Sequence, residues 1–211
     1  MRRRVMISSL ILLSAAALMT GLFLLHKERQ GQKQIANAQA GLIESIEHGH
    51  GDYALPWEDG EVWDIYSGTD TPLVQIDTQD THGIAILSIP KIELCIPVVE
   101  GVQPRDLRIA AGHMRESGEI GALGNCILLA HRSYTYGQLF NRLDELEEKD
   151  YVTLSYSGLN YVYRVIGKRV IDPGDPSMFD WEIGQRKLTL VTCTPLYKGT
   201  HRLLVECELI P

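Results

Sequence analysis

Seven short runs of β-branched, aromatic and aliphatic residues follow residue 81, and they constrain the fold of this chain more than any other feature. Such residues favour strands, and the Gly, Pro, Asn and Asp residues between the runs favour turns. The runs span residues 84–89, 92–99, 125–130, 151–156, 161–171, 188–192 and 203–210. Their spacing predicts a mainly β domain that forms one barrel or one sandwich.

One segment of this domain has a different period. Leu139, Phe140, Leu143 and Leu146 recur at helical spacing within residues 136–146, and acidic residues occupy the other side. The pattern predicts a single amphipathic helix packed on the β domain. We therefore expect a mainly β fold with one or two short helices.

The N-terminal segment differs sharply from the β domain. Residues 5–25 carry no charge and follow Arg2, Arg3 and Arg4. At about 1.5 Å per residue, a helix of this length spans roughly 30 Å, which is the thickness of a bilayer core. Because basic residues before such a run stay in the cytoplasm, we predict a single-pass membrane anchor with the rest of the chain outside the cell.

The alternative to an anchor is a cleaved signal peptide. The apolar region of a signal peptide is shorter, about 7 to 15 residues, and ends close to its cleavage site. Here the small residues that could serve as a cleavage site lie at 36–40, well beyond the apolar run. The uncleaved anchor is therefore the favoured interpretation.

Two further segments separate the predicted anchor from the β domain. Residues 27–46 are rich in Gln, Ala and Glu, which predicts a helical stalk. Residues 49–72 mix Gly, Pro, Asp and Ser with aromatic residues, which predicts an irregular linker. The expected organisation is a basic tip and anchor at 1–26, a stalk and linker at 27–80 and a β domain at 81–211.

The charge balance excludes one class of function. The net charge is −7 at neutral pH, and three of the basic residues precede the predicted anchor. The exported part is therefore more acidic than the whole chain. Since binding to nucleic acid requires a basic surface that neutralises phosphates, no nucleic-acid partner is expected.

Three of the four cysteines have an ordinary structural interpretation. Cys95, Cys126 and Cys207 lie inside apolar runs, so we expect them to be small buried strand residues, with a disulfide among them left open. No two cysteines form a C-x-x-C pair, and no run of acidic residues has the spacing of a calcium loop. The sequence therefore predicts no metal and no cofactor.

Cys193 differs from the other three because it lies where its run ends. Residues 188–195 read LTLVTCTP, and Pro195 cannot donate to a strand ladder, so the strand is expected to stop at the cysteine. A cysteine at a strand end is held rigidly and can face a groove, which suits a nucleophile. The alternative is another buried strand cysteine.

A histidine ends a second apolar run. Residues 125–133 read NCILLAHRS, so His131 stands where the sequence turns polar. Alone it would be a surface or capping residue, but strands ending in Cys193 and His131 would place thiol and imidazole at one rim. The pair matters because a free thiol has a pKa of about 8.5 and is mostly protonated at neutral pH, whereas a nearby imidazolium favours the thiolate.

Arg202 is the third candidate. If the last two runs form an antiparallel hairpin, Arg202 lies across from Cys193 and its permanently charged guanidinium can reach a developing oxyanion. The alternative is a solvated arginine at a strand start. His201 competes with His131 as a base, but it would face the opposite side of an extended strand from Arg202.

Taken together, these segments resemble the sortases, a family of bacterial cysteine transpeptidases found mainly in Gram-positive species. The matching segments are ILSIPKI at 86–92, AGH at 111–113, AHR at 130–132, TLVTC at 189–193 and HRLLV at 201–205. The resemblance runs from residue 82 to residue 211. It implies an eight-stranded β-barrel on the outer face of the membrane, in agreement with the predicted anchor.

The resemblance also implies roles for the candidate residues. Cys193 would be the nucleophile, His131 the general acid and base, and Arg202 the residue that stabilises the oxyanion or positions the substrate. Sortases cut a sorting signal of the Leu-Pro-x-Thr-Gly kind after the threonine and form a thioester. They then transfer the acyl group to an amine of a peptidoglycan precursor or to a pilin lysine, which anchors or polymerises surface proteins.

Further residues are expected to bind the substrate. Thr192 would contact the substrate backbone. In sortases the loop before the Cys193 strand helps to bind the signal, so Met178, Phe179 and Trp181 would form an apolar wall for its leucine. The generic interpretation is a long loop rich in turns.

The sequence resembles one class of sortase only in part. The CTP continuation after Cys193 resembles class C, the pilus-polymerising sortases. Class C enzymes commonly carry an Asp-Pro-aromatic lid before the barrel and a second membrane span, and neither pattern occurs in this sequence. The aromatic segment 53–66 is the nearest approximation to a lid, and classes B and D remain alternatives.

Two other functions compete with a sortase. A secreted papain-like peptidase also uses a Cys–His pair, but its cysteine opens a helix near the mature N-terminus, whereas Cys193 ends a late strand. A membrane-tethered β-barrel binding module would use Cys193 only structurally. The reactivity of Cys193 separates an enzyme from such a module.

Overall fold

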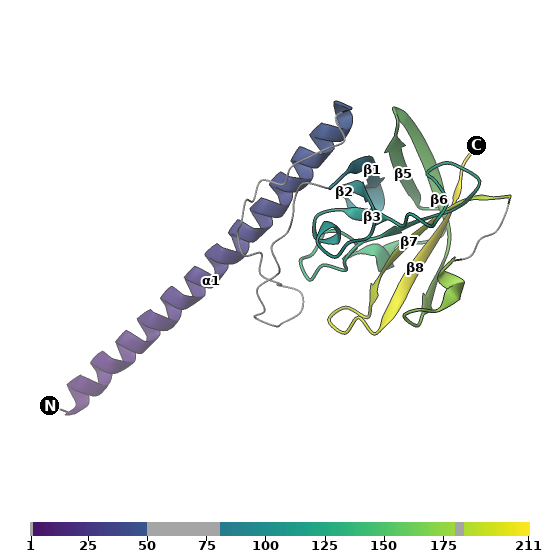
Figure 1. Cartoon of the computed structure of the whole chain (residues 1–211). Coiled ribbons are helices and arrows are strands. Elements are labelled where there is room, and N and C mark those ends of the chain that lie inside the picture. The colour runs from purple at the N-terminus through teal and green to yellow at the C-terminus, as the bar shows by residue number, and fades with distance from the viewer. Residues whose placement is uncertain (1, 50–80, 180–183) are drawn as a thin grey trace. The chain divides into compact units, whose positions relative to one another are not determined.

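The computed structural model describes residues 2–49, 81–179 and 184–211 of the chain (Figure 1). Within those ranges, one α-helix, α1 (Arg2–Glu47), precedes eight strands. The strands are β1 (Gly83–Ile89), β2 (Leu94–Glu100), β3 (Ala111–His113), β4 (Gly124–Leu129), β5 (Tyr151–Tyr156), β6 (Leu159–Ile171), β7 (Arg186–Thr194) and β8 (His201–Leu209).

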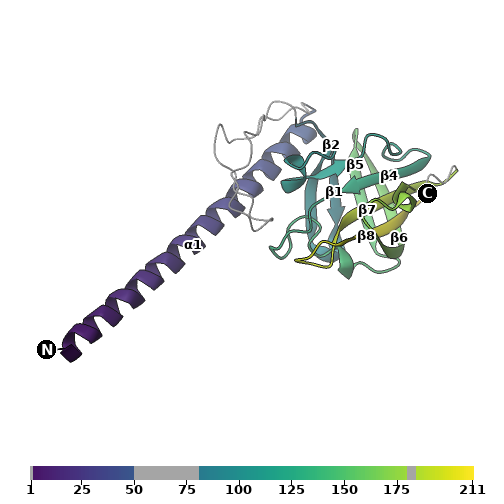
Figure 2. The ribbon, with the colours of Figure 1, turned by 60° about the horizontal axis from the view of Figure 1, so that its bottom comes forward.

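The eight strands form one closed barrel in the order β1-β2-β3-β4-β7-β8-β6-β5. The pairs β2/β3 and β4/β7 are parallel, and the other pairs are antiparallel. Figure 2 shows β7 and β8 side by side, with β6 next to β8. The predicted mainly β fold is confirmed, and the barrel rather than the sandwich is the architecture.

Alternate residues of β4, β7 and β8 fill the interior of the barrel. The inward-facing, buried members of the central core from these strands are Cys126, Leu128, Leu188, Leu190, Leu203, Val205 and Cys207. Successive side chains of a strand point to opposite faces, so the residues between them face outward. Three of these outward residues, Ile127, Val191 and Leu204, form a second apolar cluster with Ile171 on the outer face.

The predicted strand positions are confirmed within two residues at each end. β2 begins later than expected because Pro90–Ile92 form a 3-10 helix, after which Glu93 takes a left-handed conformation with φ of 53°. β3 is the strand that the β-rich runs did not predict. It has only three residues and is held by pairing with β2 and β4.

The helix predicted for residues 136–146 is wrong. Only Leu143–Glu145 form a 3-10 helix there. Leu139 has φ of 48° and forms an isolated bridge with Arg132, and the Phe140 amide donates to the His131 carbonyl at 3.1 Å. The four apolar side chains are buried as their spacing required, but they lie in a loop tied to the end of β4.

The chain divides into two compact units, residues 1–37 and residues 38–211. The last turns of α1 belong to the second unit, where Leu42 is buried and the Gln39 side chain donates to the Ile109 carbonyl at 2.9 Å. The expected stalk at 27–46 is therefore helical, as a part of α1.

Over the ranges that the structure describes, no helix combines the length and the apolar character needed to cross a membrane. The anchor at 1–26 and the domain boundaries stay predictions. The lid-like segment 53–66 and nearly all of the predicted linker lie outside the described residues.

Candidate active site

Strands β4, β7 and β8 bring the three predicted catalytic residues to one level of the barrel. The antiparallel pairing of β7 and β8 places Cys193 directly opposite Arg202, as the predicted hairpin required. The parallel pairing of β4 and β7 ends at Leu129 and Val191, and the Ala130 amide still donates to the Val191 carbonyl at 3.2 Å. Continuing this register by two residues sets His131 opposite Cys193.

Two of these residues, Cys193 and Arg202, lie on the outer face of their strands. Val191 and Leu204 belong to the outer cluster, and Cys193 and Arg202 each lie two residues away along the same strand. Because side chains alternate, Cys193 and Arg202 share that face. Cys193, Arg202 and His131, which follows the end of β4, form the candidate active site.

Thr192 precedes Cys193 on β7, and its side chain points to the inside of the barrel. It is almost completely buried, and its hydroxyl donates to the Ala130 carbonyl at 2.9 Å. This bond joins β7 to the last residue before His131. The expected contact of Thr192 with the substrate backbone stays a prediction.

The four cysteines are free, and their surroundings differ strongly. Cys126 and Cys207 are fully buried inside the barrel, where desolvation raises the pKa of Cys126 to about 12 and that of Cys207 far above its usual range. Cys193 is only half-buried. The expectation that Cys95 is buried is wrong, because it faces outward from β2 and is exposed.

The loop between β7 and β8 folds back toward Cys193. Gly199 in this loop has φ of 60°, and a Cβ placed there would lie 3.6 Å from Cys193 Cβ and 4.0 Å from its Sγ. Arg202 Nη1 donates to the carbonyls of Gly199 and His201, at 3.1 and 3.0 Å. The loop thus lies against Cys193 and binds the Arg202 guanidinium, and Gly199 is a site residue that the sequence interpretation missed.

His201, the competing base, belongs to a different environment. Its Nε2 lies 3.4 Å from Asp172 Oδ1, a carboxylate that follows the end of β6. Successive residues of an extended strand face opposite sides, so His201 and Arg202 diverge. This geometry favours His131 as the partner of Cys193.

Arg132 is a second site residue that the sequence interpretation left without a role. Its side chain is only 8% exposed, and Nη2 lies 2.7 Å from Asp144 Oδ2. Nη1 donates to Thr194 Oγ1 at 3.0 Å, and Nε donates to the Asn141 carbonyl at 3.3 Å. The guanidinium therefore connects the segment after His131 to the residue after Cys193.

Of the three residues predicted to form an apolar wall for the leucine of the signal, the structure describes the side chain of Met178. Met178 lies in the 3-10 helix Pro176–Phe179 and packs on the outer cluster that includes Val191. It therefore shares the outer face with Cys193. The Phe179 side chain and Trp181 lie outside what the structure describes, so their contribution stays a prediction.

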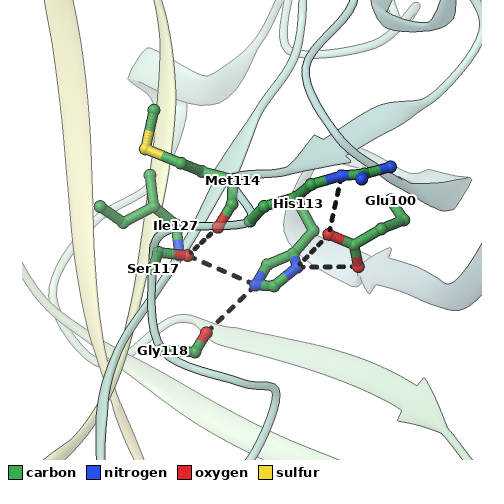
Figure 3. A network of polar contacts seen from close by, with 7 residues as sticks. Glu100, His113, Met114, Ser117, Gly118 and Ile127 are labelled. Atoms are coloured by element: carbon green, nitrogen blue, oxygen red, sulfur yellow. Dashed lines mark hydrogen bonds and ion pairs between the residues drawn. The ribbon is translucent and has the colours of Figure 1, made fainter.

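A further histidine, His113 on β3, lies in a buried polar network (Figure 3). Its Nδ1 lies 3.2 and 3.3 Å from the carboxylate oxygens of Glu100, and its Nε2 lies 3.1 Å from the Gly118 carbonyl. Ser117 Oγ donates to the Met114 carbonyl at 2.7 Å and accepts from the Ile127 amide at 3.0 Å.

Both ring nitrogens of His113 thus have partners within this network, and Nε2 also lies 3.3 Å from Ser117 Oγ. His113 is therefore a structural residue that holds the turn between β3 and β4. Among the described residues, no group of three or more His, Cys, Asp and Glu side chains is arranged to hold a metal ion.

Comparison with known proteins gives a consistent result. A family model described as the sortase domain matches residues 87–210. Sortase D of Bacillus subtilis (strain 168) is 33% identical over 110 residues, which cover 52% of this chain and 54% of that protein. Sortase A of Streptococcus agalactiae serotype III is 28% identical over 136 residues, covering 61% and 55%. The chain spans about half the length of the curated relatives it matches.

Solved structures share the barrel. A sortase A lid mutant from Corynebacterium diphtheriae has a TM-score of 0.59 at 27% identity, covering 63% of this chain and 72% of that one. Streptococcus agalactiae sortase C1 in complex with MTSET has a TM-score of 0.58 at 30% identity, covering 61% and 70%. Clostridium perfringens sortase D5 has a TM-score of 0.56 at 26% identity, covering 62% and 80%. Several sortase classes therefore match at similar levels.

Proposed function

The chain belongs to the sortase family, and from this premise we propose that it is a cysteine transpeptidase whose nucleophile is Cys193. His131 acts as the general acid and base, and Arg202 stabilises the oxyanion or positions the substrate. The observation that supports this assignment is the pairing of Cys193 on β7 with Arg202 on β8, next to the end of β4, the strand that His131 follows.

The first half of the reaction forms a thioester. The Cys193 thiolate attacks the carbonyl carbon of the threonine in a sorting signal of the Leu-Pro-x-Thr-Gly kind. The Arg202 guanidinium, held by the carbonyls of Gly199 in the β7–β8 loop and His201 at the start of β8, stabilises the developing oxyanion. His131 gives its proton to the leaving glycine nitrogen as the C–N bond breaks.

The second half transfers the acyl group. A primary amine attacks the thioester carbonyl, His131 takes the proton from the amine nitrogen, and the Cys193 thiolate leaves. The amine belongs to a peptidoglycan precursor or to a pilin lysine. With water in place of the amine the same steps would give hydrolysis, so the arrangement favours transfer only if the amine is positioned and water is excluded.

The substrate lies on the outer face of the barrel in this proposal. Met178 already packs on the outer cluster beside the Cys193 strand, and Phe179 and Trp181 come shortly after it in the sequence. These three side chains would contact the apolar leucine of the signal, and Thr192 would contact the signal backbone. Residues 5–25 would hold the domain at the outer face of the membrane, which agrees with the membrane association of sortases in general.

The experiment uses the full chain in detergent micelles. A peptide that contains a Leu-Pro-x-Thr-Gly signal is incubated with either a peptidoglycan-type amine or a lysine peptide, and products are identified by mass spectrometry. We expect cleavage after threonine and one amide-linked product. Cys193→Ala abolishes the reaction, and Arg202→Ala lowers it about 100-fold or more.

Cys95→Ala is the matched control, since Cys95 is also a strand cysteine that solvent can reach, but it lies on β2. It retains full activity. Full activity in Cys193→Ala would overturn the proposal. An inert, unreactive Cys193 in the wild type would instead favour the binding module.

A further inference from the structure

Two exposed tyrosines join the segments that follow His131 and Cys193. Tyr134 lies three residues after His131, and Tyr197 lies in the loop after Cys193. Their side chains are 41% and 72% exposed, yet the rings stack with centroids 5.0 Å apart and an interplanar angle of 22°. Such aromatic pairs contribute about 0.5–1.5 kcal/mol beyond the area that they bury.

The backbone of Tyr197 is not relaxed. Its φ of 71° lies in the left-handed region, which costs a side chain with a Cβ roughly 1–2 kcal/mol. The loop is closed there by hydrogen bonds from the Lys198 and Gly199 amides to the Pro195 carbonyl, at 3.2 and 2.9 Å. A strained residue of this kind persists where its surroundings hold it, and the stacked ring is one such contact.

A second link joins the same two segments. Arg132 donates to Thr194 Oγ1 at 3.0 Å, while the other end of its guanidinium pairs with Asp144. The Arg132–Thr194 hydrogen bond thus joins the residues directly after His131 and Cys193. The Tyr134–Tyr197 stack joins the same two segments two or three residues further on.

These links begin where the strand ladder ends. The Ala130 amide makes the last backbone bond from the end of β4 to β7, so His131 lies beyond the ladder. Backbone pairing alone therefore does not fix the separation between the His131 ring and the Cys193 thiol. Misplacing reacting groups by about 1 Å can reduce a rate about 100-fold, so a further constraint has a direct consequence for the chemistry.

We propose that the Tyr134–Tyr197 stack, together with the Arg132–Thr194 bond, forms a positioning clamp that fixes His131 against Cys193 and against the loop that binds the Arg202 guanidinium. The inference rests on the proposed function, because it assigns the residues that the clamp positions. Neither tyrosine touches the reacting atoms in this account. Both act through the segments that they hold.

The same segment supplies a matched control. Tyr136 is 71% exposed, which is close to the exposure of Tyr197. The centre of its ring lies 4.7 Å from the guanidinium carbon of Arg142, a residue of the same segment. The Tyr136→Ala change therefore removes an exposed aromatic ring and its contact with Arg142, but it leaves the contacts with the β7–β8 loop in place.

The test compares Tyr134→Ala, Tyr197→Ala, their double variant, Tyr197→Phe and Tyr136→Ala in the full chain. With a sorting-signal peptide and an amine, we expect each clamp variant to lower kcat about 10-fold with KM unchanged and the unfolding temperature lowered by only a few degrees. The double variant is no worse than either single variant, because one contact is lost in all three. Tyr197→Phe and Tyr136→Ala retain the wild-type kcat.

Three results would overturn the clamp. The alanine variants could behave as Tyr136→Ala does, their losses could add in the double variant, or KM could rise with kcat unchanged. The last result would mean that the rings bind substrate.

A second measurement separates failure of the clamp from failure of the proposed function. The rate of Cys193 alkylation by iodoacetamide at pH 7, read by peptide mass mapping, needs no sorting signal. We expect Tyr134→Ala and Tyr197→Ala to shift this rate to that of His131→Ala. If the wild type processes no peptide, the proposed function fails, and unchanged alkylation rates in the tyrosine variants would still contradict the clamp.

Discussion

The inner and outer faces of β4, β7 and β8 use the same residue type for different purposes. Inside the barrel, Cys126 and Cys207 are fully buried among aliphatic side chains. On the outer face, Cys193 is half-buried, pairs with Arg202 across the strands and lies under Gly199. Because side chains alternate along a strand, residues that stabilise the core and residues of the candidate active site are neighbours in the sequence.

The comparison shows that environment, not residue type, makes a cysteine a candidate nucleophile. Desolvation disfavours a charged thiolate, so the inner cysteines stay neutral and behave as small apolar residues. At the strand end the chain leaves the core, and charged partners become available. The following predictions test this difference between the two faces.

The largest expected contrast is in thiol reactivity. At pH 7.5 iodoacetamide modifies Cys193 at least about 1000-fold faster than Cys126, because burial raises the pKa of Cys126 to about 12 and blocks access. A time course read by peptide mass mapping measures both rates in one sample. In denaturant all four cysteines react at similar rates, and labelling of Cys126 at the Cys193 rate in the folded chain would refute the contrast.

The next largest effect distinguishes the two histidines near the site. His131→Ala lowers kcat about 100-fold or more, because the leaving nitrogen loses its proton donor. His201→Ala, whose ring pairs with Asp172, retains kcat within about threefold. Peptide cleavage assays at saturating substrate measure both variants. The reverse order of losses would assign the acid–base role to His201.

A change on the inner face affects stability instead. Leu190→Ala removes a fully buried core side chain and lowers the free energy of unfolding by about 2–5 kcal/mol. The kcat of the remaining folded molecules is unchanged. Denaturant titration measures the loss, with Val170→Ala on the exposed side of β6 as the control at less than about 0.5 kcal/mol. A Leu190→Ala variant of wild-type stability would contradict the assignment of the inner face.

The smallest effect concerns the loop over the thiol. Gly199→Ala and Gly174→Ala both place a side chain at positive φ, so each lowers the free energy of unfolding by about 1 kcal/mol. Only the Gly199 methyl lies near Cys193, because nothing lies within 4 Å of a Cβ at Gly174. Alkylation of Cys193 therefore slows severalfold in Gly199→Ala alone. Equal alkylation rates in both variants would show that the loop does not cover the thiol.

Part of the fold could be predicted from sequence because strand formation follows local composition. The long β-rich runs became strands close to their expected ends. β3 could not be found in this way, since Ala111–His113 has little β propensity and depends on the two strands beside it. Cys95 was misjudged because an apolar run does not reveal which of its residues face outward.

The error at residues 136–146 has a different cause. Helical spacing of apolar residues reports burial on one side, and these residues are buried. The backbone is governed instead by Leu139 at positive φ and by the bond from the Phe140 amide to the His131 carbonyl. A tertiary contact with the end of β4 replaced the hydrogen bonds that a helix would have made.

Some contacts of the candidate active site could be predicted from the sequence, and others could not. The pairing of Cys193 with Arg202 followed from a short loop between two strands, which local sequence reveals. The contacts of Arg132, Tyr134 and Gly199 depend on how two loops approach each other after the barrel has closed. No pattern within either loop predicts such contacts.

The most direct test of the central claim is the intact mass of the full chain after mixing with a sorting-signal peptide in the absence of an amine. We predict an adduct equal to the acyl fragment that ends in threonine, mapped to Cys193, released by hydroxylamine, present in Cys95→Ala and absent in Cys193→Ala. An adduct on another residue, or amide-linked product formed by Cys193→Ala, would contradict the account.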